Sequence, residues 1–472
     1  MIAEYIVGLS GLIAAALFIY SLKSMSSPVT AVKGIVVAGY GMLLVVLASF
    51  FSIFNVSGEA ASHLPINILL AIIALVLGGV WAAWKGKRVQ MTAMPQMVAL
   101  YNGMGGGSAA ALAAVELLGG RYTSSLSLLI AFLGALIGCV SLTGSVIAWA
   151  KLDSRLNTYR YSQQKAVNAV LFGLTIILGL IAVINYGPDD SGIFAILFYV
   201  GALAFGICMT LPIGGADMPV VISLYNAFTG LAVGLEGYVM DSPALMIAGM
   251  VVGSAGTLLT VLMAKAMNRS LSNVLFSNFG DSTAQSSADT EQKEMKSVDP
   301  ADAATTMRYA ASVIIVPGYG LAVAQAQQKL YETVKLLQDA GVDVKFAIHP
   351  VAGRMPGHMN VLLAEAGVPY DMIFDMDEIN ESFPNTDVAL VIGANDVVNP
   401  SARSDKSSPI YGMPILDVDK AHEVFIIKRG RGKGYSGVEN PLFFNENSTM
   451  VFGDAQAVLS KMVEALKALK GV

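Results

Sequence analysis

Long apolar runs fill the first 273 residues of the chain. An α-helix needs about 20 predominantly apolar residues to cross the hydrocarbon core of a bilayer. This part of the chain offers nine runs of about that length, separated by short polar connections, which predicts one compact bundle of about nine transmembrane helices. We expect the spans at residues 2–22, 34–54, 65–84, 95–118, 124–150, 166–186, 191–212, 218–240 and 243–266.

The pattern changes after residue 273. Residues 274–304 are largely polar, contain glycine and serine and lack periodicity, which is typical of a flexible linker. In residues 305–472, apolar β-branched runs alternate with helical patterns, which predicts a Rossmann-like α/β domain with a doubly wound parallel sheet. Strands are expected at 312–316, 343–348, 371–375, 388–392, 414–418, 423–428 and 449–452.

Composition agrees with a membrane protein and excludes several other classes. Of the 472 residues, 55% are hydrophobic and 13% are charged, which excludes a purely soluble protein. The net charge of -5 gives no basic footprint, so no nucleic-acid partner is expected. Cys139 and Cys208 both lie in apolar runs, so we expect packing residues and neither a disulfide framework nor a metal site.

Basic residues predict the orientation in the membrane. Lysine and arginine gather in the loops around residues 23–33, 85–88, 151–165 and 265–269, whereas the alternate loops contain only Arg121. Positively charged loops stay on the cytoplasmic side. With an odd number of helices, the amino terminus lies outside and the C-terminal domain lies in the cytoplasm.

Two of the expected helices begin with the same short sequence. Met94-Pro95 and Met218-Pro219 are each followed, at the same offset, by Leu-Tyr-Asn. Proline suits a first helical turn, and an Asn seven residues later lies about 10 Å deeper. Asn102 and Asn226 therefore act either as hydrogen-bonding contacts between helices or as parts of a polar pathway.

Small and acidic residues near the same helices are further candidates. Gly249, Gly253 and Gly256 form a small-residue stripe on the ninth helix with Ser254 beside it, a pattern that usually indicates close helix packing. Asp217 lies at the inner mouth, directly before the eighth helix, and no expected span contains a histidine.

A glycine turn follows the first expected strand of the C-terminal domain. The segment Gly318-Tyr319-Gly320 leads into a helix expected from Ala324 onward. A strand, a glycine turn and a helix start form the arrangement in which backbone N–H groups can meet a pyrophosphate. Val323 replaces the third glycine of the dinucleotide fingerprint, so the motif is incomplete.

The choice of nucleotide follows from charge. NAD-binding folds usually place an acid at the end of the second strand, but strand 343–348 runs into His349. The loop 428–435 is basic and rich in glycine and suits a 2′-phosphate, unless it is a solvated surface run. We therefore expect NADP(H) rather than NAD(H) at the carboxyl ends of the strands.

The candidate binding residues occupy the loops that follow the expected strands. No nucleophile with a base and no metal cluster accompanies them, which makes the dinucleotide itself a candidate substrate; His349, His358 and His422 are expected to be structural. The candidates are Gly318, Tyr319, Gly320, Val351, Ala352, Gly353, Arg354, Met355, Pro356, Gly393, Ala394, Asn395, Asp396, Val397, Gly412, Met413, Lys428, Arg429, Gly430, Arg431, Gly432, Lys433, Gly434, Tyr435, Asp454 and Ala455.

Several of these segments resemble a known family. They are Pro317-Gly318-Tyr319-Gly320 with residues 322–327, then residues 349–360, 393–396, 440–444, 214–219 and 265–270. Together they resemble the β-subunit family of proton-translocating NAD(P) transhydrogenases, and the similarity extends along essentially the whole chain.

The resemblance implies an enzyme subunit in a bacterial inner membrane. Residues 305–472 would bind NADP(H), with Lys428 and Arg429 on the 2′-phosphate, the 428–435 loop as a lid and the nucleotide flipped relative to ordinary dinucleotide folds. NAD(H) would lie on a partner α subunit, and two αβ units would form a dimer. Hydride would pass directly between the cofactors without a catalytic side chain, coupled to inward proton translocation through residues 1–273.

The resemblance also implies roles in coupling, and it contains one departure. Asp217, Asn226 and the glycines of the ninth helix fall on coupling positions, and Asp396 on the domain face toward the membrane. Some family members carry a proton-conducting histidine where this chain has Asn102. Either a histidine of the partner replaces it, or Asn102 and Asn226 hold water that carries the proton. The competing hypotheses are a secondary transporter gated by an NADP(H)-sensing domain and an anchored NADP sensor without catalysis.

Overall fold

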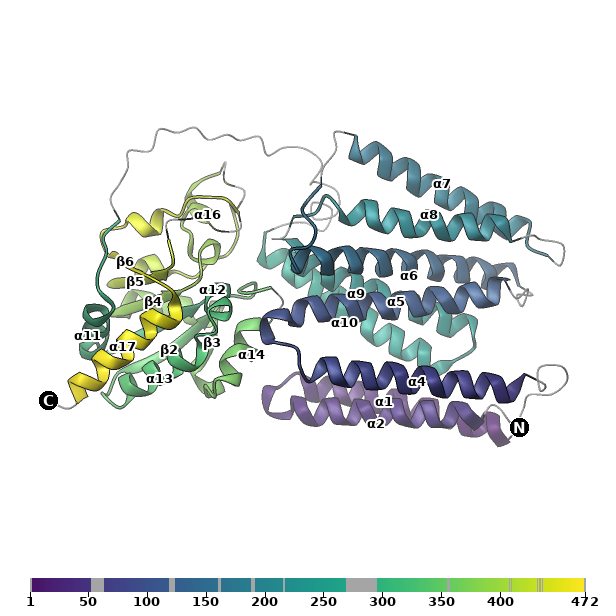
Figure 1. Cartoon of the computed structure of the whole chain (residues 1–472), viewed down its shortest axis with the longest axis horizontal. Coiled ribbons are helices and arrows are strands. Elements are labelled where there is room, and N and C mark those ends of the chain that lie inside the picture. Colours follow the sequence, from purple (N-terminus) through teal and green to yellow (C-terminus); the bar gives the residue numbers. More distant parts are fainter. Residues whose placement is uncertain are drawn as a thin grey trace. The chain divides into compact units, whose positions relative to one another are not determined.

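The chain divides into two compact units (Figure 1). One consists of Met1–Pro212 with Val221–Thr260, and the other of Ile213–Val220 with Val261–Val472. The computed structural model describes residues 2–51, 63–118, 124–159, 163–187, 192–214, 217–268, 295–354, 357–406, 408, 410–430, 432, 434 and 436–470.

Nine long helices occupy the described residues before 269. Eight are long and apolar enough to cross a membrane, which confirms the predicted multi-pass fold class. The remaining helix, α5, is the least apolar of the nine because it contains Gln96, Asn102 and a run of glycines. The helices are α1 (Ile2–Met25), α2 (Pro28–Ser49), α4 (Leu64–Gly86), α5 (Met94–Leu118), α6 (Ser125–Leu152), α7 (Gln164–Ile184), α8 (Ile193–Thr210), α9 (Met218–Val239) and α10 (Pro243–Ala266).

The second helix differs from the span expected at 34–54. It begins at Pro28 and ends at Ser49. Proline is favoured in a first helical turn because its missing N–H would have no helical partner there. Residues 52–54 of the expected span lie outside the described part of the chain.

Small residues bring α5 and α6 close together. A Cβ on Gly103 would lie 3.0 Å from Ser145 Cβ, and a Cβ on Gly138 would overlap the Gly106 carbonyl oxygen. Apolar side chains gain little from leaving lipid, so membrane helices associate through such close backbone packing. The glycines of α5 therefore position its polar residues against α6.

The C-terminal unit contains a six-stranded parallel sheet, which confirms the predicted Rossmann-like α/β class. Its order is β3-β2-β1-β4-β5-β6, and all neighbouring pairs are parallel. The order reverses between β1 and β4, where ligands bind in folds of this kind. The strands are β1 (Ser312–Pro317), β2 (Asp343–Ile348), β3 (Ile373–Asp375), β4 (Val388–Ile392), β5 (Glu423–Lys428) and β6 (Ser448–Phe452).

Helices and short 3-10 turns connect the strands, and α11 and α13 both pack on the C-terminal helix α17. The helices are α11 (Pro300–Tyr309), α12 (Tyr319–Val323), α13 (Gln327–Gln338), α14 (His358–Glu365), α15 (Met376–Ile379), α16 (Ser401–Ser404) and α17 (Ala455–Lys470). The turns are η2 (Met91–Ala93) before α5, then η5 (Tyr370–Met372), η6 (Asn380–Asn385), η7 (Asp396–Val398), η8 (Val418–Lys420) and η9 (Pro441–Phe444).

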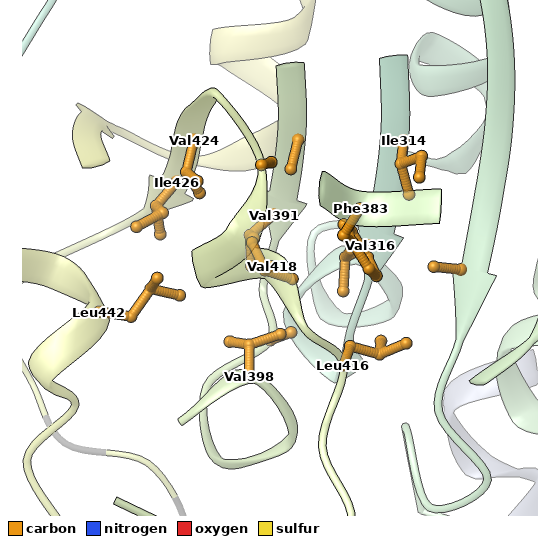
Figure 2. Packing of buried hydrophobic residues seen from close by; sticks show 14 of the residues in the cluster. Ile314, Val316, Phe383, Val391, Val398, Leu416, Val418, Val424, Ile426 and Leu442 are labelled. Carbon is orange, nitrogen blue, oxygen red and sulfur yellow. The ribbon is translucent and has the colours of Figure 1, made fainter. Parts of the chain in front are cut away.

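A continuous hydrophobic core covers one face of the sheet (Figure 2). Ile314 and Val316 of β1, and Val424 and Ile426 of β5, lie two residues apart and therefore point to the same face. Phe383 packs against them from η6. This core fixes the carboxyl ends of the central strands, where the candidate binding loops begin.

The strand predicted at 414–418 was wrong. This segment is an irregular stretch before η8, and its backbone groups are bonded outside the sheet. The Leu416 N–H donates to the Val397 carbonyl oxygen at 2.9 Å, and Asn380 Nδ2 donates to the Ile415 carbonyl oxygen at 3.0 Å. Its apolar pattern arises because Leu416 and Val418 belong to the core.

Two segments near the start of the domain also differ from expectation. From Met295 the described chain already belongs to the domain, since the Val298 N–H donates to the Met450 carbonyl oxygen at 3.0 Å; residues 274–294 of the expected linker lie outside the described part. The helix expected from Ala324 begins at Gln327, because Gln325 adopts φ +50° and interrupts it after α12.

Candidate functional site

The loops after β1 and β4 contact each other backbone to backbone. The Gly318 N–H donates to the Ile392 carbonyl oxygen at 2.8 Å, and the Gly320 N–H donates to the Gly393 carbonyl oxygen at 3.0 Å. Gly393 has φ +66°, and a Cβ there would overlap Gly320 Cα. The glycine turn therefore serves the meeting of two loops, and these two N–H groups are engaged within the protein.

The incomplete fingerprint has a structural reason. Its third glycine normally lets a long helix pack closely on the strand. Here α12 has five residues, and Val323 is exposed at its end. Because the Val323 side chain is exposed to solvent, the position does not require a glycine.

The loop after β2 is held by two buried histidines. His349 Nε2 donates to the Pro414 carbonyl oxygen at 2.8 Å, and its Nδ1 accepts from the Val351 N–H at 3.2 Å, which fixes the neutral tautomer. Burial lowers the pKa of His349 to about 4. His358 Nδ1 accepts from the Arg354 N–H at 3.2 Å. Burial and the Arg354 guanidinium lower the pKa of His358, so both rings serve as structural hydrogen-bonding groups of this loop.

Arg354 extends from this loop toward the glycine turn. Its guanidinium carbon lies 4.5 Å from the centre of the Tyr319 ring, which is close enough for a cation–π contact. The His358 ring centre lies 6.1 Å from the same Tyr319 ring. The predicted residues Tyr319 and Arg354 are thus brought together, whereas Met355 and Pro356 lie outside the described residues.

The loop after β5 is tied to the loop after β4. Asp396 Oδ1 accepts from Ser436 Oγ at 2.7 Å and its Oδ2 accepts from the Ser436 N–H at 3.0 Å. Asn440 Nδ2 donates to the Asn395 carbonyl oxygen at 3.1 Å. A Cβ on Gly434 would overlap Asp396 Oδ1. The described end of the basic loop therefore lies against the loop after β4, where Asp396 holds it.

Lys428 stands at the base of the basic loop. Its ammonium donates to the Gly432 carbonyl oxygen and lies 4.3 Å from the centre of the Phe443 ring. Partial burial lowers the pKa of Lys428, which the Asp396 carboxylate opposes. Arg429 is exposed beside it. Residues 431, 433 and 435 of the loop lie outside the described part of the chain.

The remaining candidates have structural explanations. Val397 and Met413 pack in hydrophobic clusters, and Ala352, Ala394 and Ala455 are buried. The Gly412 N–H donates to the Ala402 carbonyl oxygen at 2.7 Å. Asp454 Oδ1 accepts from the Gln456 N–H at the start of α17. The glycine turn, Arg354, residues 393–396 and the described part of loop 428–434 are thus brought together through contacts.

Two residues that hold the basic loop, Ser436 and Asn440, were not predicted from the sequence to do so. Asn440 was detectable in part, because an Asn before Pro441 is typical of a capped turn, and its Oδ1 accepts from the Leu442 N–H at 3.0 Å. Nothing near Ser436 in the sequence indicates that it would meet Asp396.

In the membrane unit, Asn102 and Asn226 have different surroundings. Asn102 Nδ2 donates to the Ile222 carbonyl oxygen at 3.3 Å, and the Asn102 carbonyl oxygen accepts from Thr229 Oγ1 at 2.9 Å, so it joins α5 to α9. Asn226 instead lies toward α10, where a Cβ on Gly256 would be 3.1 Å from its Nδ2. The two amides of the sequence repeat therefore occupy different helix interfaces.

The small-residue stripe on α10 packs directly on α9. A Cβ on Gly249 would overlap the Gly234 N atom, and a Cβ on Gly230 would overlap the Gly253 N atom. Ser254 is exposed, and its hydroxyl donates to the Met250 carbonyl oxygen of its own helix at 2.6 Å. Asp217 is buried directly before α9. The glycines thus bring α9 and α10 into close contact.

Comparison with known proteins agrees with this combination of apolar membrane helices and a parallel-sheet α/β unit. The family model for the NAD(P) transhydrogenase beta subunit matches residues 7–465. The chain belongs to this family. It is 43% identical over 467 residues to the NAD(P) transhydrogenase subunit beta of Rhodospirillum rubrum, which covers 96% of this chain and 98% of the relative, and the protein of the same name from a named strain of that species gives the same values.

Membership in the transhydrogenase β-subunit family decides between the functional hypotheses. The chain is an enzyme subunit that takes part in transhydrogenation between nicotinamide nucleotides. The alternative of a nucleotide-gated secondary transporter is not supported, because the similarity covers both the membrane helices and the α/β unit. As a β subunit, the chain works with an α subunit.

Proposed function

We propose that this chain binds NADP(H) at the carboxyl edge of its sheet, while an α subunit binds NAD(H). Hydride passes directly between the two cofactors, and its transfer is coupled to inward proton movement through the helices of residues 1–273. The observation that supports this proposal is the contact of Gly434 and Ser436 with Asp396 in the loop after β4, since the described basic residues Lys428 and Arg429 begin the same loop at the end of β5.

The residues at this edge fit a nucleotide with a 2′-phosphate. β2 ends at Ile348, and the next residue is a buried neutral histidine rather than the acid that would hold a 2′-hydroxyl. Partial burial disfavours the charged form of Lys428, so a phosphate beside it would stabilise the ammonium. NADP(H), when bound, supplies the nicotinamide that accepts or donates the hydride.

The hydrogen bonds of the glycine turn support a flipped nucleotide. In ordinary dinucleotide folds the pyrophosphate meets free N–H groups of this turn. Here the N–H groups of Gly318 and Gly320 donate to carbonyl oxygens of the β4 end. A pyrophosphate placed against the basic loop and Arg354 instead would meet cations.

Further parts of the assembly are proposed on sequence grounds. The Lys/Arg bias of the loops supports a cytoplasmic C-terminal unit, and the similarity to a bacterial transhydrogenase β subunit supports a bacterial inner membrane. Helix α4 has no buried residue within the described chain, so its surface is open to lipid or to the α subunit. We place two αβ units in the complex, and we assign coupling roles to Asn102, Asp217, Asn226 and the α10 positions Gly249, Gly253, Ser254 and Gly256.

Proteoliposomes that contain this chain and its α partner, with the α/β units facing the medium, test the coupling. Reduction of NAD⁺ by NADPH is expected to acidify the vesicle interior, because the reverse reaction moves protons opposite to the forward direction. An uncoupler is expected to accelerate the reaction by discharging the opposing gradient. A rate that is indifferent to the uncoupler, without acidification of the interior, would contradict the proposal.

A further inference from the structure

A carboxylic acid lies buried in the described part of the helix bundle. Glu236 of α9 is 1% exposed, and neither of its carboxyl oxygens has a hydrogen-bond partner among the described residues. It faces α6, where a Cβ on Gly134 would lie 2.5 Å from Glu236 Oε1. Glu116 of α5 is close enough to interact with it electrostatically.

The surroundings of Glu236 offer its negative charge no compensation in the described residues. The α6 sequence carries no charged side chain from Ser125 to Ala150, and the Glu116 carboxylate would repel a second negative charge. An ionisable group in a membrane bundle is costly to keep charged and usually marks an ion or proton pathway. The lowest-cost state is a protonated acid that gives up its proton only when a route is provided.

Polar residues continue from Glu236 along one face of α9. Tyr225 and Thr229 precede it by eleven and seven residues, which places all three on the same side of the helix. Each one meets α6. Tyr225 fills the space beside Gly144, and Thr229 Oγ1 lies 2.7 Å from Ser141 Oγ. We call these three residues, with Gly134, Ser141 and Gly144 of α6, the α6–α9 seam.

The α6–α9 seam extends toward the basic end of the bundle. The Tyr225 hydroxyl is hydrogen-bonded to Thr210 Oγ1 of α8. The Thr210 carbonyl oxygen accepts from Lys151 Nζ at 3.1 Å. Ser141 Oγ also donates to the Tyr225 carbonyl oxygen at 3.1 Å. A series of hydroxyl groups therefore extends from the middle of the bundle to Thr210, whose carbonyl oxygen contacts Lys151. Lys151 lies at the end of the bundle that we propose to be cytoplasmic.

In the contact between α9 and α10, one buried hydroxyl pair occurs among the described residues, where Thr260 Oγ1 donates to Ser223 Oγ at 3.0 Å, and glycines line the helix contact from Gly256 toward Glu236. These glycines bring the two backbones together, so little space for polar groups is left between Gly230 and Gly253. The Ser254 hydroxyl bonds its own helix and is exposed. Tyr225, Thr229 and Glu236 point instead toward α6.

We propose that Glu236 is a proton-carrying group of this chain. Its carboxylate takes up one proton from the end of the bundle opposite Lys151, becomes a carboxylic acid, and releases that proton toward the Thr229–Ser141 hydroxyl pair. Seven residues of helix separate Glu236 from Thr229, about 10 Å, and water molecules would bridge this distance. Each hydroxyl accepts a proton on its oxygen and passes on its own, so no group other than Glu236 changes its charge.

This inference rests on the proposed coupling and adds to it a titrating group in the β subunit itself. The test uses the holoenzyme in proteoliposomes and the variant Glu236→Gln, which keeps the shape of the side chain but cannot carry a proton. Acidification of the interior per hydride transferred is expected to fall at least tenfold, and the uncoupler should no longer accelerate NADPH oxidation. NADPH binding should be unchanged. Glu236→Asp, which keeps the acid, is expected to retain part of the activity.

Asp241→Asn is the matched control, because it removes the same charge five residues further on at an exposed position. It is expected to pump as the unmodified enzyme does. Infrared difference spectra between the NADP⁺-bound and NADPH-bound enzyme give an independent readout: a protonated-carboxyl band that changes between the two states should be missing in Glu236→Gln and present in Asp241→Asn.

Unchanged acidification by Glu236→Gln would overturn the inference and leave the proposed function intact. Failure of the unmodified enzyme to acidify the vesicles would instead contradict the proposed function. Thr229→Val, which removes one hydroxyl of the α6–α9 seam at constant volume, decides the question if Glu236→Gln does not assemble. It is expected to slow acidification several-fold, and an unchanged rate would overturn the proposal.

Discussion

Replacing Gly393 by alanine is expected to abolish NADPH binding by this chain and to destabilise the switch point of the sheet by about 3 kcal/mol. Two effects add. Gly393 has φ +66°, where a side chain is strained, and the new Cβ would overlap Gly320 Cα, so the loops after β1 and β4 must separate. NADPH fluorescence titration of the purified full-length chain measures binding, and hydrogen exchange of the β1 and β4 amides measures stability.

Gly341→Ala separates the two effects. Gly341 also has a positive φ, +89°, but a Cβ there would have no atom within 4 Å. It should therefore cost only the backbone strain, about 1 kcal/mol, and leave NADPH binding unchanged. Equal losses of binding in the two variants would show that contact between the two loops is not what positions the nucleotide.

The second large effect concerns the charge of the basic loop. Lys428→Ala and Arg429→Ala are each expected to weaken NADPH binding by roughly 1 to 3 kcal/mol, about 5- to 150-fold, as for lost charge-assisted hydrogen bonds. NADH lacks the 2′-phosphate, so its binding should not change. Titrations with both nucleotides measure the difference.

Lys461→Ala serves as the matched control for the loss of a positive charge. Lys461 lies exposed on α17, outside the candidate site, and its replacement should affect neither nucleotide. If Lys428→Ala weakened NADH and NADPH binding equally, the assignment of the basic loop to the 2′-phosphate would be wrong.

The apolar pattern predicted most of the fold because it records burial directly. The central strands β1, β4 and β5 are buried on both faces, so each contains a run of consecutive apolar residues rich in Val and Ile. The same reasoning failed at 414–418, where Leu416 and Val418 are buried in the core from a segment outside the sheet. Periodicity reports that a residue is buried, but it does not report which backbone partner its segment finds.

The candidate site was predictable only as a set of loops. In a parallel sheet, the segments after each strand must meet at one edge, so Gly318, Gly393 and Lys428 could be chosen from the sequence. The closure through Asp396 and Ser436 could not, because 40 residues separate them and only the folded loop brings them together.

The membrane part shows a similar limit. The sequence repeat correctly indicated that Asn102 and Asn226 lie inside helices of the bundle, but it suggested equivalent roles. The structure places Asn102 in a hydrogen-bonded contact with α9 and Asn226 toward α10. Likewise, the sequence shows Glu236 only as an acid near the end of an expected span. Its burial depends on a glycine in α6, which no local pattern reveals.

Titration of the purified full-length chain, without its α partner, with NADPH and separately with NADH is the most direct test of the claim that this chain is the NADP(H)-binding subunit. We expect NADPH to bind to one site per chain at least tenfold more tightly than NADH. Equal affinities for the two nucleotides, or no binding of NADPH, would contradict it.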